Sequence, residues 1–189
     1  MKVKRTLKMK VRHYEVGDII SFKMLTGEKV ELMAMEQKGD VMQFCFVDCL
    51  GTEYPMNDDC SNEGGYDESK LRKILNSDIL SRFPNKILAR MVKFENGDFL
   101  SLPTEKEMFG KNIYGEDEPE NVKQWKPMKK RRNRIAFRGL KEEWEWYFLK
   151  NKVKESASDF CLVYDDGNAT YIGAGDSCGV RPTLLLKNN

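Results

Sequence analysis

The sequence predicts an α+β domain, built mostly of antiparallel strands with two short helices. Short apolar runs separated by glycine-containing turns occur near both ends of the chain, as they do in antiparallel sheets. Between them, apolar residues recur at helical spacing. The 189 residues contain no internal repeat. We therefore expect a basic N-terminal arm over 1–13 and one domain over 14–189, with a charged insertion at about 111–141.

The first third of the domain predicts a three-stranded meander. A turn at 16–18 leads into an apolar run, and two further apolar runs follow after short turns that contain glycine. Runs of this length, separated by such turns, are typical of consecutive hairpins. The expected strands are residues 19–24, 29–35 and 41–47.

A helix is expected after the polar loop 51–65. Asp67 or Ser69 can cap it, because a short side-chain oxygen accepts a hydrogen bond from a free N–H group of the first turn. Its apolar face comprises Leu71, Ile74 and Leu75. This spacing matches one side of an α-helix.

Strands are expected again beyond Pro84, at 86–94 and 99–102. The dipeptide Asn96-Gly97 between them predicts a hairpin, because both residues accept positive φ at low cost. Thr104 and Glu107 have the spacing of a capping box, which predicts a brief second helix ending near Gly110.

The last part of the chain predicts more antiparallel strands. Apolar runs occupy residues 144–149 and 180–186, and a hairpin is expected between 159–164 and 169–172. The segment 111–143 has no regular pattern.

Composition excludes several classes of protein. Apolar residues make up 40% and aromatic residues 11% of the chain, as in folded soluble proteins. No apolar run approaches the roughly 18 residues of a membrane span, and the basic N-terminus lacks the apolar core of a signal peptide. Five cysteines without Cys-x-x-Cys spacing indicate buried thiols rather than a metal site or disulfides. We expect a cytoplasmic protein that does not bind a membrane.

Positive charge is gathered into two segments. Residues 1–12 carry six basic and no acidic side chains, and residues 121–141 carry nine basic and no acidic ones. The rest of the chain holds 17 basic residues against 30 acidic ones, although the formal net charge is only +2. Dense blocks of like charge repel one another and are seldom part of a packed core.

The second basic segment has three interpretations. It is a solvated loop, or it pairs with the preceding acidic run Glu116–Glu120, or it binds an anionic macromolecule whose phosphates release counterions on contact. Trp125 and Phe137 lie among the cations and suggest stacking on exposed bases. The third interpretation assigns the contacts to Lys123, Lys126, Lys129, Lys130, Arg131, Arg132, Arg134 and Arg138, with Lys4 and Arg5 of the arm as auxiliaries.

Several motifs occur in the order of a known family. They are Tyr66–Asn76 (YDESKLRKILN), Phe99–Gly110, Trp146–Asn151, Phe160–Gly167 and Gly179–Leu186 (GVRPTLLL). On these motifs, residues 14–187 resemble a domain-of-unknown-function family of gut bacteria and their phages. That family is distantly similar to C-type-lectin-like domains, which include the formylglycine-generating enzymes.

The resemblance implies a C-type-lectin-like core and a structural role for Arg181, which would bind a loop carbonyl or a carboxylate. Three features depart from the relatives. The closely spaced cysteines of the enzymes and the calcium motifs of the lectins are both missing, so the sequence implies no cofactor and no metal. Lys150 stands where family members usually have arginine, which loses a bidentate contact.

Catalytic signals are weak. His13 is the only histidine and lies in the basic arm, where no triad is expected. The acidic pairs Asp58-Asp59 and Asp165-Asp166 have the context of turns. We therefore expect no catalytic residues and a non-enzymatic binding protein.

The expected partner is a nucleic acid or a nucleoprotein complex. By analogy with the phage relatives, the protein could inhibit a nucleic-acid-processing defence machine of the host. One alternative is a lectin-like module with a ligand cleft near Trp146 and Tyr147. A second alternative is a divergent oxidoreductase of the formylglycine-generating type.

Overall fold

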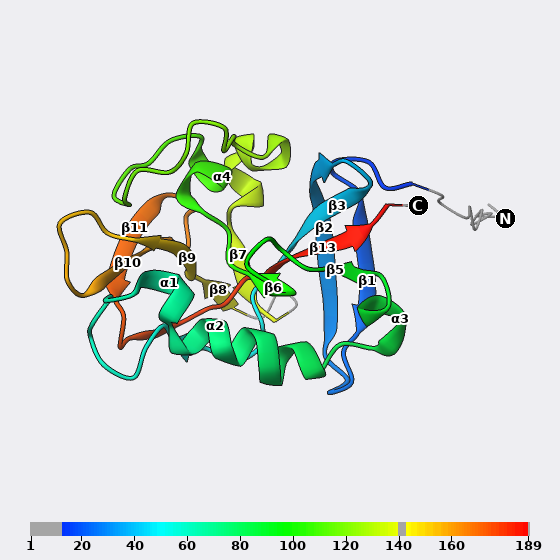
Figure 1. Cartoon of the computed structure of the whole chain (residues 1–189), viewed down its shortest axis with the longest axis horizontal. Coiled ribbons are helices and arrows are strands. Elements are labelled where there is room, and N and C mark those ends of the chain that lie inside the picture. The colour runs from blue at the N-terminus through cyan, green and yellow to red at the C-terminus, as the bar shows by residue number, and fades with distance from the viewer. Residues whose placement is uncertain (1–12, 140–142, 189) are drawn as a thin grey trace, which may run out of the picture.

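The computed structural model describes residues 13–139 and 143–188. Two main antiparallel sheets form the body, and the helical segment 70–79 packs against one face of the larger one (Figure 1). Two further sheets have two strands each. One pairs β4 (Tyr54–Pro55) with β12 (Ser177–Cys178), and the other pairs β7 (Ala136–Arg138) with β8 (Glu143–Glu145). The α+β class is thus confirmed.

The larger sheet has the strand order β1-β2-β3-β13-β5, with β6 also pairing with β13. Its strands are β1 (Ile19–Lys23), β2 (Lys29–Lys38), β3 (Val41–Phe46), β5 (Met91–Val92), β6 (Leu100–Ser101) and β13 (Thr183–Lys187). The meander predicted from the sequence is therefore confirmed, and the closing strand β13 lies inside this sheet rather than at its edge.

The smaller sheet has the order β11-β10-β9. Its strands are β9 (Tyr147–Lys152), β10 (Asp159–Val163) and β11 (Ala169–Gly173). The predicted hairpin between β10 and β11 is present, with Val163 opposite Ala169 at its closed end.

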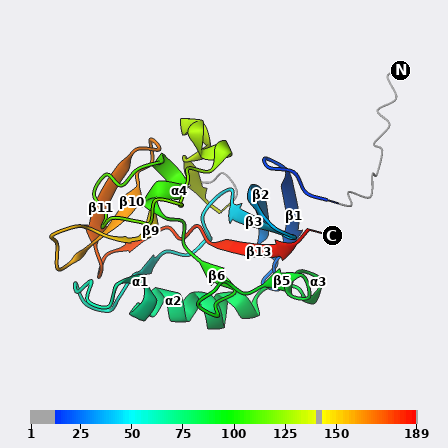
Figure 2. The same cartoon turned by 45° about the horizontal axis from the view of Figure 1, so that its top comes forward.

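In the described part of the chain, four short α-helices connect the strands, and one of them is extended by a π-helical turn (Figure 2). They are α1 (Gly65–Glu68), α2 (Lys70–Ile74) with its continuation η1 (Leu75–Ile79), α3 (Asn85–Leu88) and α4 (Glu105–Phe109). Ser69 caps α2, and Thr104 and Glu107 form the predicted capping box of α4, which Gly110 ends in the left-handed conformation.

The expected strand at 86–94 is wrong. Pro84 is the N-cap of the short helix α3, and within 86–94 only Met91 and Val92 form a strand. The turn around Asn96 and Gly97 forms as predicted, but β5 and β6 each pair with β13 instead of with each other. An apolar run of this length fits a helix and a strand equally well, so a distant partner decides between them.

The family motif in α1–η1 is structural. Asn76 accepts hydrogen bonds from the backbone N–H groups of Phe99 and Leu100 and donates to the carbonyl of Leu100. Arg72 makes a two-point ion pair with Asp98, at 2.6 Å from Nε and 3.1 Å from Nη2. The motif therefore fixes the turn before β6 onto the helix.

The larger sheet separates two apolar cores. Phe44 and Phe46 of β3 pack toward α2 and η1, in a core with Leu71, Leu75 and Phe83. Cys45 of the same strand belongs to a second core on the opposite face, which lies under α4 and β9. Alternate residues of a strand point to opposite faces, so β3 supplies both cores.

Glu107 is a buried carboxyl whose charge should oppose folding. Burial raises its pKa from the usual 4.5 to about 7, and Thr104 N–H and Gln43 Nε2 donate to it. Between these two pH values the unfolded chain ionises more readily than the folded one, so stability falls as pH rises. We expect the free energy of unfolding to drop by about 2 kcal/mol between pH 5 and pH 8 from this group. Urea titrations of Glu107→Gln should lack this drop, and an unchanged pH dependence would contradict the assignment.

Within the described residues, no helix is both long enough and apolar enough to cross a membrane.

Candidate nucleic-acid interface

The basic segment that begins near residue 121 folds as two short 3₁₀ turns, η2 (Lys126–Lys129) and η3 (Arg131–Asn133). Pro127 is the second residue of η2, where its missing N–H group and fixed φ favour the start of a helical turn. Trp125 and Met128 are buried in the second core, beside Met35 and Met108. The apolar side of the segment therefore anchors it, and the cations point outward.

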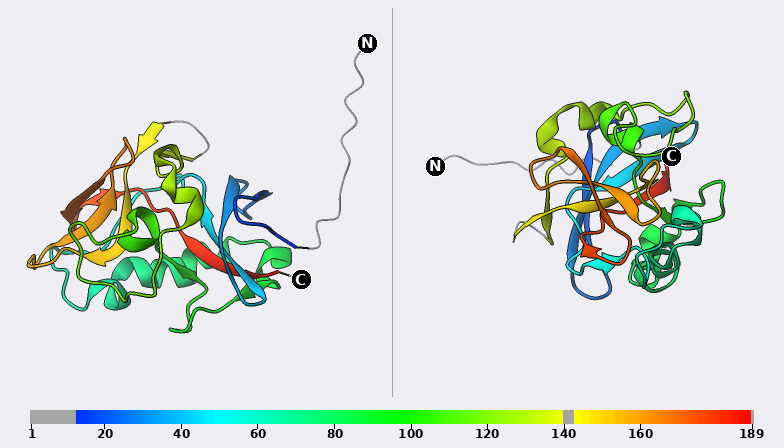
Figure 3. Two further views of the ribbon diagram at one scale, coloured as in Figure 1. Left: turned by 90° about the horizontal axis from the view of Figure 1, so that it is seen from above. Right: turned by 90° about the vertical axis from the view of Figure 1, so that its left-hand side faces the viewer.

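Five of these cations are exposed residues of the two turns and the link between them, and together we call them the basic ledge. It comprises Lys126, Lys129, Lys130, Arg131 and Arg132. In the view from above, the yellow-green turns that carry it lie between the two sheets (Figure 3). Among the described residues, none of these five side chains takes part in an ion pair.

The acidic run before the ledge pairs with strand β9 and its extension. Glu116 pairs with Lys152 at 3.2 Å, and Asp117 pairs with Lys154 at 3.4 Å. Glu118 accepts hydrogen bonds from the backbone N–H group of Lys106 and from Asn151. Pairing of this run with the ledge, one of the three sequence interpretations, is therefore absent from the described residues.

Two expected contact residues have structural roles instead. Arg134 donates to the carbonyls of Met128 and Gly167 and lies over the ring of Phe109 at 5.1 Å. Burial lowers the pKa of Arg134 from its usual value. Its Nε and Nη1 are thus engaged by backbone carbonyls of the protein, which makes Arg134 a structural residue rather than a free phosphate-binding cation.

Arg138, in contrast, is paired with carboxylates of the protein itself. Its Nε donates to the buried carboxylate of Glu145 at 2.7 Å, and Glu53 and Glu143 also pair with its guanidinium. The hydrogen bond with Glu145 raises the pKa of Arg138. Three carboxylates around one cation leave local negative charge, so Arg138 is corrected from a contact residue to a structural one.

The remaining expected contacts lie at the margins. Lys123 is exposed and donates to the carbonyl of Glu120 at 3.1 Å, one turn before the ledge. Lys4 and Arg5 lie outside the described residues. His13, the first described residue, contacts the carbonyl of Asn188 at 2.8 Å.

Arg181 ties the ledge to the core. It is 1% exposed, and its Nε donates to the carbonyl of Phe46 at 2.6 Å. Its Nη2 donates to the carbonyl of Asn133 at 3.1 Å, at the end of η3. Its Nη1 donates to Tyr147 Oη, which in turn donates to the carbonyl of Arg134. The structural role that the resemblance implied for Arg181 is confirmed.

Two aromatic residues that the sequence assigned to ligand contacts, Trp125 and Tyr147, are buried in the core. Trp125 is 1% exposed and cannot stack on a base, and Tyr147 is completely buried. Trp146 is 37% exposed and packs against Tyr164, while Trp144 covers Phe137. Tyr147 is therefore a core residue rather than the wall of a ligand cleft.

The cysteines agree with the sequence expectation. Cys45, Cys49, Cys161 and Cys178 are buried free thiols, and only Cys60 is exposed. Burial raises the pKa of Cys45 to about 11 and raises those of the other three buried thiols as well. At neutral pH these four are therefore protonated, and a protonated thiol is a poor nucleophile. Within the described residues, no cluster of His, Cys, Asp or Glu side chains could hold a metal ion.

A groove runs beside the ledge, which we call the ledge groove. Its volume is about 470 Å³. One wall consists of Val16, Ile19 and Met33, and the other of Pro127 and Asn133 with the cations Lys126, Lys130 and Arg132. The sequence did not reveal this groove, since residues more than 90 positions apart form its two walls.

A separate hollow of about 440 Å³, the polar cleft, lies between the family motif and β9. Lys150 pairs with Asp67 at 3.5 Å and lies over the ring of Tyr66 at 5.4 Å. Lys152 and Glu116 form a second ion pair in its wall. Lys150 makes a one-point contact, as expected where a lysine replaces arginine.

Comparison with curated proteins and with solved structures gave no significant match. One family does match, over residues 23–188. This range covers both sheets except the first four residues of β1, and it includes the helices α1 to α4 and the basic ledge. The chain therefore belongs to the family described as a domain of unknown function, DUF6273.

Proposed function

We propose that this protein binds nucleic acid through the basic ledge, and that it acts by binding rather than by catalysis. The observation that carries the proposal is the set of five exposed cations, none of which is paired with a carboxylate of the described chain. Cations that already have partners release few counterions on binding, whereas unpaired ones contribute fully to association with phosphates.

Local anchoring also supports a binding surface. Arg181 and Tyr147 hold the backbone carbonyls at the end of η3, and Trp125 and Met128 hold η2 from below. A preformed array of cations loses less conformational entropy on binding than a flexible one. The contacts would neutralise phosphates and set the position of the strand, without reading sequence.

Fluorescence anisotropy with labelled DNA and RNA of generic sequence, at a series of salt concentrations, tests the proposal. We expect the logarithm of the association constant to fall linearly with the logarithm of salt concentration, with a slope of about −3 to −4.5 if most ledge cations contact phosphate. Affinity that does not change with salt, or no binding at low salt, would contradict it.

Finer expectations from the resemblance stay part of this proposal. They are a C-type-lectin-like core, an origin in gut bacteria or their phages, and inhibition of a nucleic-acid-processing defence machine of the host. The cytoplasmic location expected from the sequence is part of the proposal as well. A surface that neutralises phosphates without reading sequence would suit such an inhibitor, since it would not depend on one target sequence.

The polar cleft supports a second candidate, the lectin-like ligand site, at a different place from the one expected. Its two Lys–carboxylate pairs, Lys150–Asp67 and Lys152–Glu116, would match a small zwitterion that carries both signs of charge. Calorimetric titration with single free amino acids should then give saturable heat that Asp67→Asn removes. The described thiols and carboxylates offer no comparable observation in favour of the oxidoreductase alternative.

A further inference from the structure

The ledge groove has an apolar side that phosphate binding alone does not explain. Ile19 and Met33 are directly opposite each other on β1 and β2. Ile19 is 51% exposed and Val16 is 40% exposed, and Pro127 also lines the groove. Isolated exposed apolar residues are common, but neighbouring ones in a concave site indicate a surface that binds something.

Cations line the opposite rim of the same groove. Lys126, Lys130 and Arg132 come from η2, the link after it and η3, and all three are exposed. Asn133, whose carbonyl Arg181 holds at 3.1 Å, is also part of this wall. The hydrogen bond from Arg181 therefore fixes the cationic rim to the core next to Arg132.

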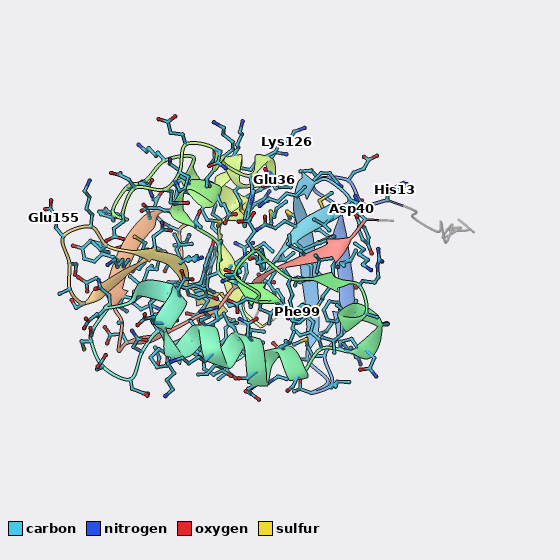
Figure 4. The ribbon with its side chains drawn as sticks, viewed as in Figure 1. His13, Glu36, Asp40, Phe99, Lys126 and Glu155 are labelled. Atoms are coloured by element: carbon cyan, nitrogen blue, oxygen red, sulfur yellow. The ribbon has the colours of Figure 1, made fainter. Side chains whose placement is uncertain are left out.

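A second, smaller hollow of about 230 Å³ adjoins the groove. The two share Val16 and Lys126, and the second is also lined by Met35, Gln124 and Trp125. Figure 4 places Lys126 near Glu36, which lines the second hollow as well. Lys126 thus lies between the two hollows, so a phosphate bound to it would have a hollow on either side.

From this arrangement we propose that the ledge groove receives an unstacked base of a single-stranded nucleic acid, with Lys126 binding the phosphate beside it. The inference rests on the proposed function and names its substrate class. A duplex keeps its base faces stacked inside and could contact only the cationic rim. A single strand could in addition bury a base against apolar side chains, as proteins that bind flipped or unpaired bases do.

Electrostatics alone predicts the opposite preference, because a duplex carries the higher density of phosphate charge. Selection of single strands therefore reports on the groove. In anisotropy titrations at equal salt, a 12-nucleotide single strand should bind about tenfold more tightly than a 12-base-pair duplex. Equal or weaker binding of the single strand would overturn the inference but leave the proposed function intact.

A matched pair of substitutions locates the effect. Ile19→Asn places a polar group in the groove wall, whereas Leu25→Asn makes the same type of change at a residue that is 69% exposed and outside the groove. We expect Ile19→Asn to weaken single-strand binding about tenfold and duplex binding by less than twofold, and Leu25→Asn to change neither. Thermal melting of both variants verifies that they remain folded.

A strand with one 2-aminopurine gives a direct readout, because its emission rises when the base leaves the stack. Emission should rise on binding to the unmodified protein and not on binding to Ile19→Asn. An unchanged signal with the unmodified protein would overturn the inference. A peptide of alternating glutamate and leucine tests the other occupant. If this peptide bound more tightly than the single strand, and Ile19→Asn abolished its binding, the inference would be overturned, because the groove would then bind an acidic protein partner. If the unmodified protein bound neither single strands nor duplexes at low salt, the proposed function itself would be refuted.

Discussion

Replacing Arg181 with methionine should lower the free energy of unfolding by about 4 kcal/mol. The side chain is buried, and its removal leaves the carbonyls of Phe46 and Asn133 and the hydroxyl of Tyr147 without their donor. A buried polar group without a partner costs its full desolvation energy. For a chain of 189 residues, this loss corresponds to a fall in Tm of roughly 8–16 °C.

Urea denaturation and thermal melting measure the effect, with Arg132→Met as the matched control. That control makes the same change of residue type at an exposed side chain without an ion pair among the described residues. It should leave the free energy of unfolding within about 0.5 kcal/mol of the original. A loss below about 1 kcal/mol for Arg181→Met would show that the hydrogen bonds around it are dispensable.

Removing four ledge cations together should have the largest effect on binding. Alanine at Lys129, Lys130, Arg131 and Arg132 should reduce affinity for nucleic acid roughly 100- to 1,000-fold at moderate salt, and should bring the salt slope about 3 units closer to zero. Because none of the four forms an ion pair in the described chain, Tm should stay within about 2 °C.

The control removes the same amount of charge elsewhere on the surface. It places alanine at four exposed lysines outside the ledge, namely Lys23, Lys73, Lys86 and Lys111. Its affinity should fall by less than about tenfold, since screened charges beyond a Debye length contribute little. Equal losses in the two variants would indicate a response to net charge alone and would remove the ledge from the proposal.

Local patterns in the sequence predicted the local elements well. The hairpins between β1 and β2 and between β10 and β11, the Ser69 cap and the Thr104–Glu107 capping box all depend on residues close together in the chain. The strand expected at 86–94 failed for the opposite reason. The extent of this strand depends on its pairing with β13, which lies about 90 positions further along the chain.

The candidate site was predictable only in part. Charge density correctly marked the segment around Lys126–Arg132 as exposed, but it also included Arg134 and Arg138, which bind carbonyls and carboxylates of the protein itself. The charged surroundings of Trp125 also suggested an exposed ring. The tryptophan is instead buried, because it lies on the inner side of a turn whose outer side is charged. Arginine and lysine patterns do not reveal which partners folding brings near.

The position of β13 has a consequence for how the chain is made. Arg181, just before that strand, bonds to the carbonyl of Phe46 across 135 positions of sequence, and β13 itself fills the place beside β3. While the intervening residues emerge from the ribosome, β3 offers an unpaired strand edge to any neighbouring chain. Long-range pairing of this kind folds slowly. Nascent chains stalled before residue 183 should therefore depend on chaperones to remain free of aggregates.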